Sequence, residues 1–301
     1  MDRIGYFFTR LLVELFRFVP FWLLYRLSDG LAFLLYHVAG YRRQVVWDNL
    51  RRSFPEKTAQ EIAVIARNSY RNLTDVMLET MKSYTLPIWE IQRRCPPLNP
   101  ELLNQYLDRG QSVLLSGCHY NNWEYTGITM PPAFHGTAVT AYKPLTNKLM
   151  DAYVNRTRER TGMVMVSMED TFKIMRLREN ERKPSVYILL ADQSPSSRKS
   201  AHWVVFLGQE TASLPGVDVL ARKFNFPVLF YEVRRRRRGF YDVQFFEICV
   251  NPSEAGEKGI TQAYARQLET LIREQPENWL WSHKRWKMKR EDAEIDRLER
   301  V

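Results

Sequence analysis

The segment Ser112–Glu124, SVLLSGCHYNNWE, decides the fold class and supplies the first candidate site. Its apolar first half has the character of a buried strand, and His119 follows shortly after that run. Asn121 and Asn122 come next, and asparagine is a residue type that caps helices. We therefore predict a strand, a turn that carries His119, and a short helix with Glu124 in its first turn.

His119 and Glu124 form a candidate general base and its partner, because imidazole titrates near neutral pH and a carboxylate can orient it. On one regular helix a five-residue offset rotates the chain by about 500°, which leaves the two side chains about 140° apart. The pair can therefore act together only if His119 precedes the helix. An alternative stays open, in which the histidine is buried against a main-chain carbonyl and Glu124 is merely favourable near a helix N-terminus.

The chain has 301 residues and a formal net charge of +10. A surplus of this size fits an anionic partner, such as nucleic acid, an anionic membrane surface or an acidic carrier protein. We predict no nucleic-acid partner, because zinc-ligand spacing and an aromatic RNP-like strand motif are both missing. Cys95, Cys118 and Cys249 are too widely spaced for a disulfide framework or a metal site, which predicts a reduced, cytoplasmic setting.

Residues 6–40 are rich in Leu, Phe, Tyr and Trp but carry scattered charges. They lack the apolar core and cleavage site of a secretory signal, and their charge-free runs are shorter than the roughly 20 residues of a membrane span. Pro20 is expected to divide them into two helices. We predict amphipathic helices in a membrane interface, with residues 1–45 as the anchor and 46–301 as one α/β domain. Helices packed on that domain, or a tilted span with snorkelling arginines, are the alternatives.

Strand and helix patterns alternate along the second part of the chain, which predicts a mixed, mainly parallel sheet flanked by helices. Strands are expected at residues 112–116, 137–142, 163–167, 185–191, 228–233 and 241–249. Helices are expected at residues 58–83, 100–108, 147–160, 170–180, 213–225 and 260–274. The last two strands are close enough in sequence to form a hairpin that turns near Gly239.

Polar side chains follow three of these strands. His119 comes after the first strand, Lys143 directly after the second, and Asp192 with Gln193 directly after the strand at 185–191. Sites in parallel sheets form at the carboxyl ends of the strands, so we expect these side chains to converge. A chance set of polar loop residues is the alternative.

Short motifs over nearly the whole chain resemble those of one enzyme family. They are Asn49-Leu50-Arg51 with Phe54-Pro55, Gly117-Cys118-His119 through Trp123-Glu124, Tyr142-Lys143-Pro144-Leu145, Asp192-Gln193, Phe206-Leu207-Gly208 with Ser213 and Gly216, and Pro276-Glu277 through Trp281, His283, Arg285, Trp286 and Lys287. In this order they resemble the late lipid A acyltransferases, the lauroyl and myristoyl transferases of lipopolysaccharide assembly, within a superfamily marked by a His-x4-Asp/Glu motif. Two positions depart from the family pattern. Lys143 replaces the commoner Arg and loses bidentate clamping, and Ser213 replaces the commoner Thr but keeps the hydroxyl.

The resemblance implies an O-acyltransferase with a fold like that of the glycerolipid acyltransferases, on the cytoplasmic face of the inner membrane. It would move a fatty acyl chain from acyl carrier protein or acyl-CoA to a hydroxyl of a lipid A precursor, without a metal or redox cofactor. One alternative is acylation of another glycolipid or an amino lipid. A second alternative is a non-catalytic basic protein that binds the membrane surface.

The resemblance also implies roles for individual residues. His119 would deprotonate the acceptor hydroxyl, while Glu124 would fix the tautomer of the ring and stabilise the imidazolium. Asp192 and Gln193 would position the acceptor or a neighbouring residue that carries a positive charge. The other residues expected to contact substrate are Asn122, Lys143, Arg160 and Ser213.

Other features have competing interpretations. A thiolate mechanism through Cys118 is disfavoured, because neighbouring residues on an extended strand face opposite ways. Zinc hydrolysis does not fit the His-x4-Glu spacing. The run Arg234–Arg238 indicates either an anionic contact or a solvated hairpin rim, and we favour the former. The tryptophans Trp279, Trp281 and Trp286 suit a membrane interface or a C-terminal helix packed on the sheet.

Overall fold

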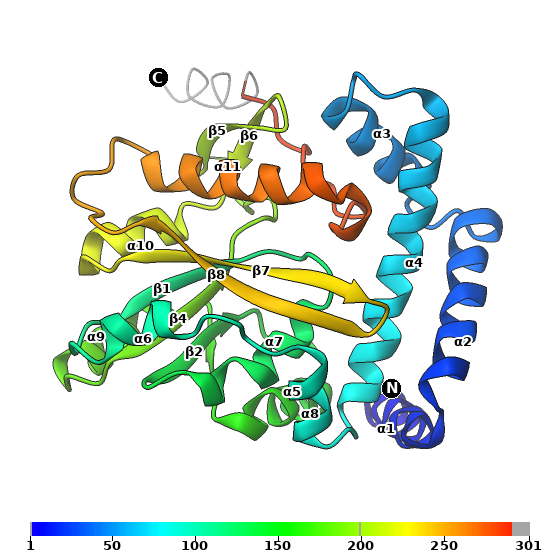
Figure 1. Cartoon of the computed structure of the whole chain (residues 1–301), viewed down its shortest axis with the longest axis horizontal. Helices are drawn as coiled ribbons and strands as arrows, with labels where there is room; N and C mark the ends of the chain where they lie inside the picture. The colour runs from blue at the N-terminus through cyan, green and yellow to red at the C-terminus, as the bar shows by residue number, and fades with distance from the viewer. Residues whose placement is uncertain (1, 199, 291–301) are drawn as a thin grey trace.

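A six-stranded sheet with the order β3-β2-β4-β1-β7-β8 organises the chain in the computed structural model, which describes residues 2–198 and 200–290 (Figure 1). The strands are β1 (Val113–Gly117), β2 (Thr137–Tyr142), β3 (Val164–Ser167), β4 (Ser185–Leu190), β7 (Val228–Arg237) and β8 (Phe240–Cys249). All neighbours pair in parallel except β7 and β8, which form an antiparallel hairpin. The predicted mixed, mainly parallel sheet is confirmed, and so is its hairpin at Gly239.

Two hydrophobic cores cover the two faces of the sheet, because successive residues of a buried strand point to opposite sides. Leu114 belongs to the core that includes residues of α9 (Thr171–Asn180), α10 (Gly216–Phe224) and α11 (Gly259–Glu274). Val113 and Leu115 belong to the core that includes residues of α5 (Ile88–Arg94), α6 (Glu101–Leu107) and α7 (Trp123–Thr129). The helix α8 (Lys148–Arg158) follows β2, and short 3-10 turns lie at Pro131–Ala133, Glu159–Thr161 and Pro276–Asn278.

The long helix α4 (Ala59–Ser83) stands beside the tip of the β7–β8 hairpin, with α1 (Asp2–Phe18) and α2 (Phe21–Phe33) on its far side (Figure 1). Thr58 and Glu61 form a capping box that fixes the start of α4. Pro20 separates α1 from α2 as predicted. A π-helical turn, η1 (Leu34–Val38), and α3 (Arg43–Ser53) complete this part. In the described ranges 2–198 and 200–290, none of the helices combines the length and the apolar character needed to cross a membrane.

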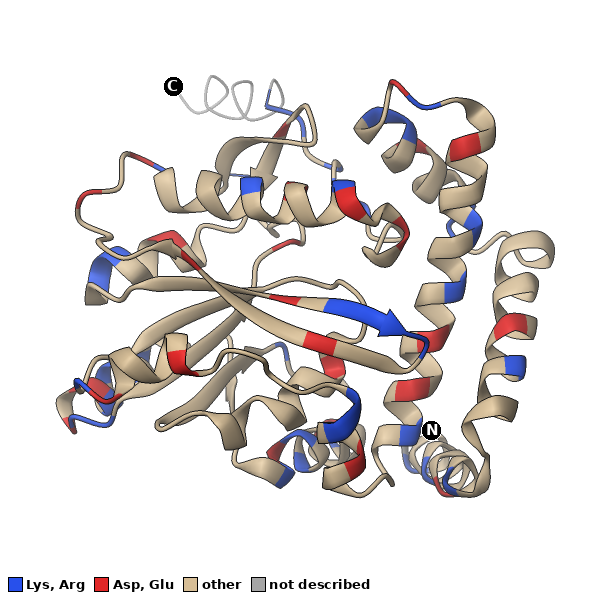
Figure 2. Ribbon diagram, in the orientation of Figure 1, with Lys and Arg blue, Asp and Glu red and all other residues tan. Residues whose placement is uncertain are grey.

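Part of the arginine run at the hairpin tip is bound inside the protein, through Arg235 and Arg238, whereas Arg234, Arg236 and Arg237 are exposed. The anionic contact stays a prediction for the exposed arginines. Arg238 donates to Asp29 of α2 and to Asp75 of α4, at 2.8 and 2.6 Å. Figure 2 shows the basic hairpin tip next to acidic positions on α4. The turn residue Gly239 has φ = 77°, and a Cβ there would lie 1.9 Å from the Tyr25 hydroxyl. The tip is therefore built to fit against α2 and α4.

The sequence prediction missed two helices and one small sheet. They are the helix α3, the helix α5 and a small two-stranded sheet made of β5 (His202–Phe206) and β6 (Gln209–Ser213). For the C-terminal tryptophans, packing in the core is confirmed for Trp279 and Trp281, but the predicted helix is wrong, because residues 279–289 are turns and extended chain. Trp279 and Trp281 are buried, at 2% and 1% exposure, so they pack in the core and do not face a membrane.

Candidate active site

His119 and Asp192 meet at the carboxyl ends of the neighbouring strands β1 and β4. His119 Nδ1 lies 2.7 Å from Asp192 Oδ1, and the His119 main-chain N–H donates to Asp192 Oδ2 at 3.0 Å. Trp279 Nε1 donates to the same Oδ2 at 2.9 Å. The Asp192 carboxylate is 2% exposed and the His119 imidazole is 17% exposed. Three N–H groups therefore surround a buried carboxylate, while the imidazole remains partly accessible. The predicted convergence of strand ends is confirmed for this pair.

Mutual attraction sets the charge states of His119 and Asp192. Burial alone would lower the pKa of His119, but the charge and hydrogen bond of Asp192, with a contribution from Glu124, raise that pKa above its usual value. Burial alone would raise the pKa of Asp192, but His119 and Trp279 lower it to about 2. Because the carboxylate is ionised, Nδ1 carries the proton that it accepts, and in the neutral form of the ring Nε2 is the acceptor. Gln193 Nε2 lies 3.3 Å from that nitrogen.

Glu124 does not hold the ring of His119, and the expectation that it fixes the tautomer is wrong. Its carboxylate forms a bidentate ion pair with Arg158 at the end of α8, with distances of 2.8 and 2.9 Å. The two side chains are 20% and 28% exposed. Burial alone would lower the pKa of Arg158, but the charge and hydrogen bonds of Glu124, with smaller contributions from Tyr84 and Asp151, together raise that pKa. Glu124 therefore acts on His119 only at longer range, through its charge.

Asn122 begins α7, as the capping pattern predicts, but it does not face a substrate. Its Oδ1 accepts from the Tyr125 main-chain N–H at 3.1 Å, and its Nδ2 donates to Glu79 at 2.7 Å. Tyr25 and Tyr241 donate to the same Glu79 carboxylate. All of Asn122 is buried, so the predicted substrate contact is replaced by a structural one that ties the start of α7 to α4.

Arg160 and Ser213 also have structural partners, while Lys143 lies near the site. Arg160 donates to the Ser83 and Leu86 carbonyls at the end of α4, at 2.9 and 3.1 Å. Ser213 Oγ accepts from buried Arg285 at 2.9 Å. Lys143 lines the same cavity as His119. Of the residues predicted to bind substrate, the cavity thus contains Lys143 and Gln193 but neither Arg160 nor Ser213.

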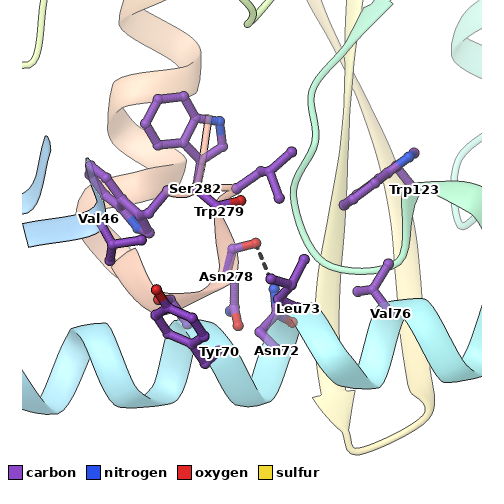
Figure 3. Close-up of a pocket in the computed structure, with 12 residues that line it drawn as sticks. Val46, Tyr70, Asn72, Leu73, Val76, Trp123, Asn278, Trp279 and Ser282 are labelled. Atoms are coloured by element: carbon purple, nitrogen blue, oxygen red, sulfur yellow. Dashed lines mark hydrogen bonds between the residues drawn. The ribbon is translucent and has the colours of Figure 1, made fainter. Parts of the chain in front are cut away.

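The C-terminal segment closes over the turn that carries His119. The Leu280 main-chain N–H donates to the His119 carbonyl at 3.1 Å. Asn49 Nδ2 donates to the Trp281 carbonyl, and Asn72 Nδ2 donates to the Asn278 carbonyl, each at 2.9 Å. Figure 3 shows the second of these bonds beside a cavity of about 10 Å³, which has room for about one water molecule. Motifs far apart in the sequence therefore assemble around one loop.

Two larger cavities open on either side of Trp123. The first, of about 320 Å³, contains His119 and has a largely apolar wall that includes Met130, Met163, Met165 and Ile188. We call it the methionine cavity. The second, of about 500 Å³, lies between α4 and the C-terminal segment. We call it the α4 cavity, and its polar residues include Tyr41, Arg42 and His283. Trp123, Glu124 and Gln193 line both cavities.

The thiol of Cys118 is not placed for nucleophilic chemistry. Cys118 is 2% exposed and belongs to the core on the α10–α11 face, away from the cavity. Burial, with the charge of Asp192 beside it, raises the pKa of the thiol well above its usual value. Within residues 2–198 and 200–290, no cluster of His, Cys, Asp and Glu is arranged to hold a metal ion.

Three residues of the site escaped prediction as site residues, namely Arg158, Trp279 and His283. Arg158 is two positions from the predicted Arg160, a separation that turns a helix by about 200° and reverses the face. His283 Nε2 accepts from the Ser194 main-chain N–H at 3.0 Å, and burial lowers its pKa to about 4, which keeps it neutral. The sequence signal that could have identified His283 as a site residue was its position in the C-terminal motif.

Comparison with known proteins gives a consistent result. The family model described as bacterial lipid A biosynthesis acyltransferase matches residues 2–288. A lipid A biosynthesis lauroyltransferase of Escherichia coli is 24% identical over 276 residues, which cover 91% of this chain and 88% of that protein. A lipid A biosynthesis palmitoleoyltransferase of the same organism is 22% identical over 251 residues, which cover 82% and 79%. The chain therefore belongs to the bacterial lipid A biosynthesis acyltransferase family.

Proposed function

We propose that the protein transfers a fatty acyl chain from a thioester, carried by acyl carrier protein or coenzyme A, to a hydroxyl of a lipid A precursor. The observation that carries this proposal is an imidazole at the wall of a largely apolar cavity, with a buried carboxylate hydrogen-bonded to its Nδ1. Family membership supplies the substrate class. As the resemblance implies, the proposed site of action is the cytoplasmic face of the inner membrane.

The proposed reaction uses His119 as both base and acid. Nε2 takes the proton of the acceptor hydroxyl as the hydroxyl oxygen attacks the thioester carbonyl carbon. When the tetrahedral intermediate collapses, the C–S bond breaks, and the proton passes from Nε2 to the departing sulfur. The products are an ester and a free thiol, with no change of oxidation state. Gln193 Nε2 lies 3.3 Å from His119 Nε2, so in this proposal the acceptor hydroxyl takes the place of the amide when it binds.

In this proposal Glu124 acts mainly through Arg158. The bidentate pair fixes a guanidinium at the wall of the methionine cavity, where it supplies positive charge for the developing oxyanion. The charge of Glu124 also contributes to the raised pKa of His119, which stabilises the imidazolium. Lys143, in the same cavity wall, offers a point charge to a phosphate or sugar group of the acceptor.

The proposal assigns the methionine cavity to the acyl chain, because flexible thioether side chains adapt to an alkyl chain. Ile188→Phe at its buried wall is expected to shift the preferred donor to a shorter chain. Excluding two methylenes forfeits about 1.6 kcal/mol, or about 15-fold in kcat/KM for the longest good donor. Met168→Phe, on a 59% exposed residue of the same cavity, is the matched control. A chain-length series measured on both variants decides, and equal profiles would refute this assignment.

The N-terminal helix supports the proposed membrane association. Exposed apolar side chains of α1 recur on one face, as Ile4, Phe7, Leu11, Leu15 and Phe18. We call this face the α1 stripe. The opposite face carries the buried residues Val13 and Phe16 and packs against the rest of the protein. One apolar face of α1 is buried against the protein, and the other is exposed. A lipid interface would supply an apolar environment for the exposed face.

The α1 stripe yields a binding prediction. Phe7→Ser combined with Phe18→Ser removes two side chains that are 63% and 80% exposed. Losing at least about 3 kcal/mol of transfer free energy is expected to weaken vesicle partitioning about 100-fold. Leu177→Ser with Val219→Ser, on residues 50% and 52% exposed, is the control and should leave partitioning unchanged. Co-sedimentation with liposomes measures both, and equal losses would contradict membrane insertion of α1.

Transfer of a labelled acyl chain tests the function itself. The purified protein is incubated with acyl carrier protein or coenzyme A thioesters and a panel of acceptors, and the products are resolved by mass spectrometry. Ester formation on a lipid A precursor is the expected result. Transfer only to another glycolipid or an amino lipid would replace the acceptor in the proposal. No transfer to any acceptor would favour a non-catalytic protein that binds the membrane surface.

A further inference from the structure

A third cavity, of about 310 Å³, lies between the end of α2 with η1 on one side and α4 on the other. It shares no lining residue with the methionine cavity or the α4 cavity. Its polar wall includes His37 from the π-helical turn and Arg67, Asn68 and Arg71 from α4. We call the cavity lined by these four residues the basic cavity. Figure 2 shows basic positions on this upper part of α4 and on α3.

The four side chains of the basic cavity form no hydrogen bond with any part of the chain that the structure describes. Arg67 and Arg71 are one helical turn apart, so they face the same way. Across residues 2–198 and 200–290 their guanidinium groups form no hydrogen bond or ion pair, whereas Arg158, Arg222 and Arg238 are each paired with a carboxylate. A carboxylate in the wall, Asp29, is committed to Arg238 through both oxygens. The cavity therefore keeps an uncompensated positive charge.

The histidine that faces these arginines lies on an irregular element. The turn Leu34–Val38 is π-helical, a distortion that occurs frequently at functional sites. His37 stacks on Phe33 at 4.8 Å between ring centroids and meets Tyr36 edge-on at 4.7 Å. Tyr36 also lines a neighbouring cavity with Arg43 and Arg51, which extends the positive surface. The geometry thus gathers donors that suit the oxygens of a phosphate.

Exposed apolar residues of α2 and η1, of which Phe33 lines the cavity, indicate whether the phosphate belongs to a lipid or to a soluble molecule. Phe33, Leu34 and Val38 are 60%, 47% and 68% exposed and belong to the same two elements as the cavity wall. A small soluble phosphate has no use for such apolar residues, whereas a lipid brings acyl chains beside its headgroup. We propose that the basic cavity binds the phosphate of a lipid headgroup in the bilayer. This inference rests on the proposed membrane association and does not depend on the acyl-transfer chemistry.

Vesicle binding tests the site with a matched pair of variants. The full-length protein is titrated with phosphatidylcholine vesicles that contain phosphatidic acid, and separately with phosphatidylcholine vesicles alone. Arg67→Gln with Arg71→Gln removes two charges from the basic cavity. Lys173→Gln with Arg176→Gln removes two exposed charges from α9 and is the control. The first variant is expected to bind the phosphatidic acid vesicles at least about tenfold more weakly than the control, because direct phosphate contacts add to the general surface attraction.

Three outcomes would overturn the proposal. Equal losses in both variants would show that only net charge matters. Binding of soluble glycerol phosphate as tight as that of the vesicles would assign the cavity to a free phosphate. Loss of binding to an acidic acyl carrier protein, with vesicle binding unchanged, would assign it to that protein. Binding to phosphatidylcholine alone and acyl transfer to a soluble acceptor analogue are measured in parallel, so failure of this site is distinguishable from failure of the proposed function.

Discussion

His119→Ala is expected to reduce acyl transfer by about two to four orders of magnitude, the usual contribution of a positioned general base. The imidazole lies at the wall of the methionine cavity, and its Nδ1 is hydrogen-bonded to Asp192. Removing the imidazole therefore leaves the acceptor hydroxyl of the substrate without a proton acceptor. Because binding of the acyl chain depends on other residues of the cavity, the loss should appear in kcat while KM for the thioester changes little. Steady-state kinetics with a labelled thioester measures the effect.

The chain offers a matched control for that substitution. His135 Nδ1 lies 2.8 Å from Asp108, but the two side chains are 61% and 58% exposed. His135→Ala therefore removes a histidine–aspartate pair of similar geometry from the solvent-exposed surface, where such pairs contribute little. This variant should retain wild-type activity. Wild-type activity in His119→Ala itself would refute His119 as the base.

Asp192→Asn is expected to lower the rate by about two to four orders of magnitude and to move its pH dependence. The neutral imidazole is the active form, so the rate rises with pH through the pKa of His119. The negative charge of Asp192 raises that pKa, and its removal lowers the pKa. The ascending limb of the kcat/KM profile should therefore move to lower pH, while its plateau falls because an amide no longer enforces the Nδ1–H tautomer.

Asp108→Asn is the control for the Asp192→Asn prediction, because it removes the carboxylate charge from the exposed His135–Asp108 pair and leaves the His119–Asp192 pair intact. It should change neither the plateau nor the ascending limb. The thermal unfolding midpoint of Asp192→Asn is measured alongside, since the Trp279 N–H also donates to this carboxylate. A reduced rate with an unmoved pH profile would indicate a structural role for Asp192 and would contradict its action on the ring.

The centre of the sheet was predictable from the sequence because β1 and β4 are largely buried on both faces and read as continuous apolar runs. The segments at 112–116, 137–142 and 185–191 were each placed within one residue of the observed strand ends. The β5–β6 hairpin was missed although its signal was present. Leu207 and Gly208 both have positive φ, at 49° and 71°, and join two short strand-like segments. The segment had been interpreted only as a family motif.

Some residues of the candidate site were predictable from the sequence, among them His119, Asp192 and Gln193, but the partner of His119 was not. Sequence spacing favoured Glu124 as the partner of His119. Spacing predicts the relative orientation of two side chains only when the residues are close along the chain. The observed partner, Asp192, is 73 positions away and reaches the ring because β4 pairs directly with β1. Arg158 was missed for a related reason, because the rotational phase of α8 cannot be derived from a run of several arginines. Such errors arise where tertiary pairing decides among chemically equivalent candidates.

The titration of His119 tests the central claim most directly. NMR of selectively labelled histidine in detergent-solubilised protein follows its pKa, with the signal assigned by its loss in His119→Gln. A pKa above the usual value of 6.5 in the wild type, and a lower value in Asp192→Asn, is the predicted result. A wild-type pKa at or below 6.5, or the same pKa in both proteins, would contradict the proposed histidine–aspartate unit.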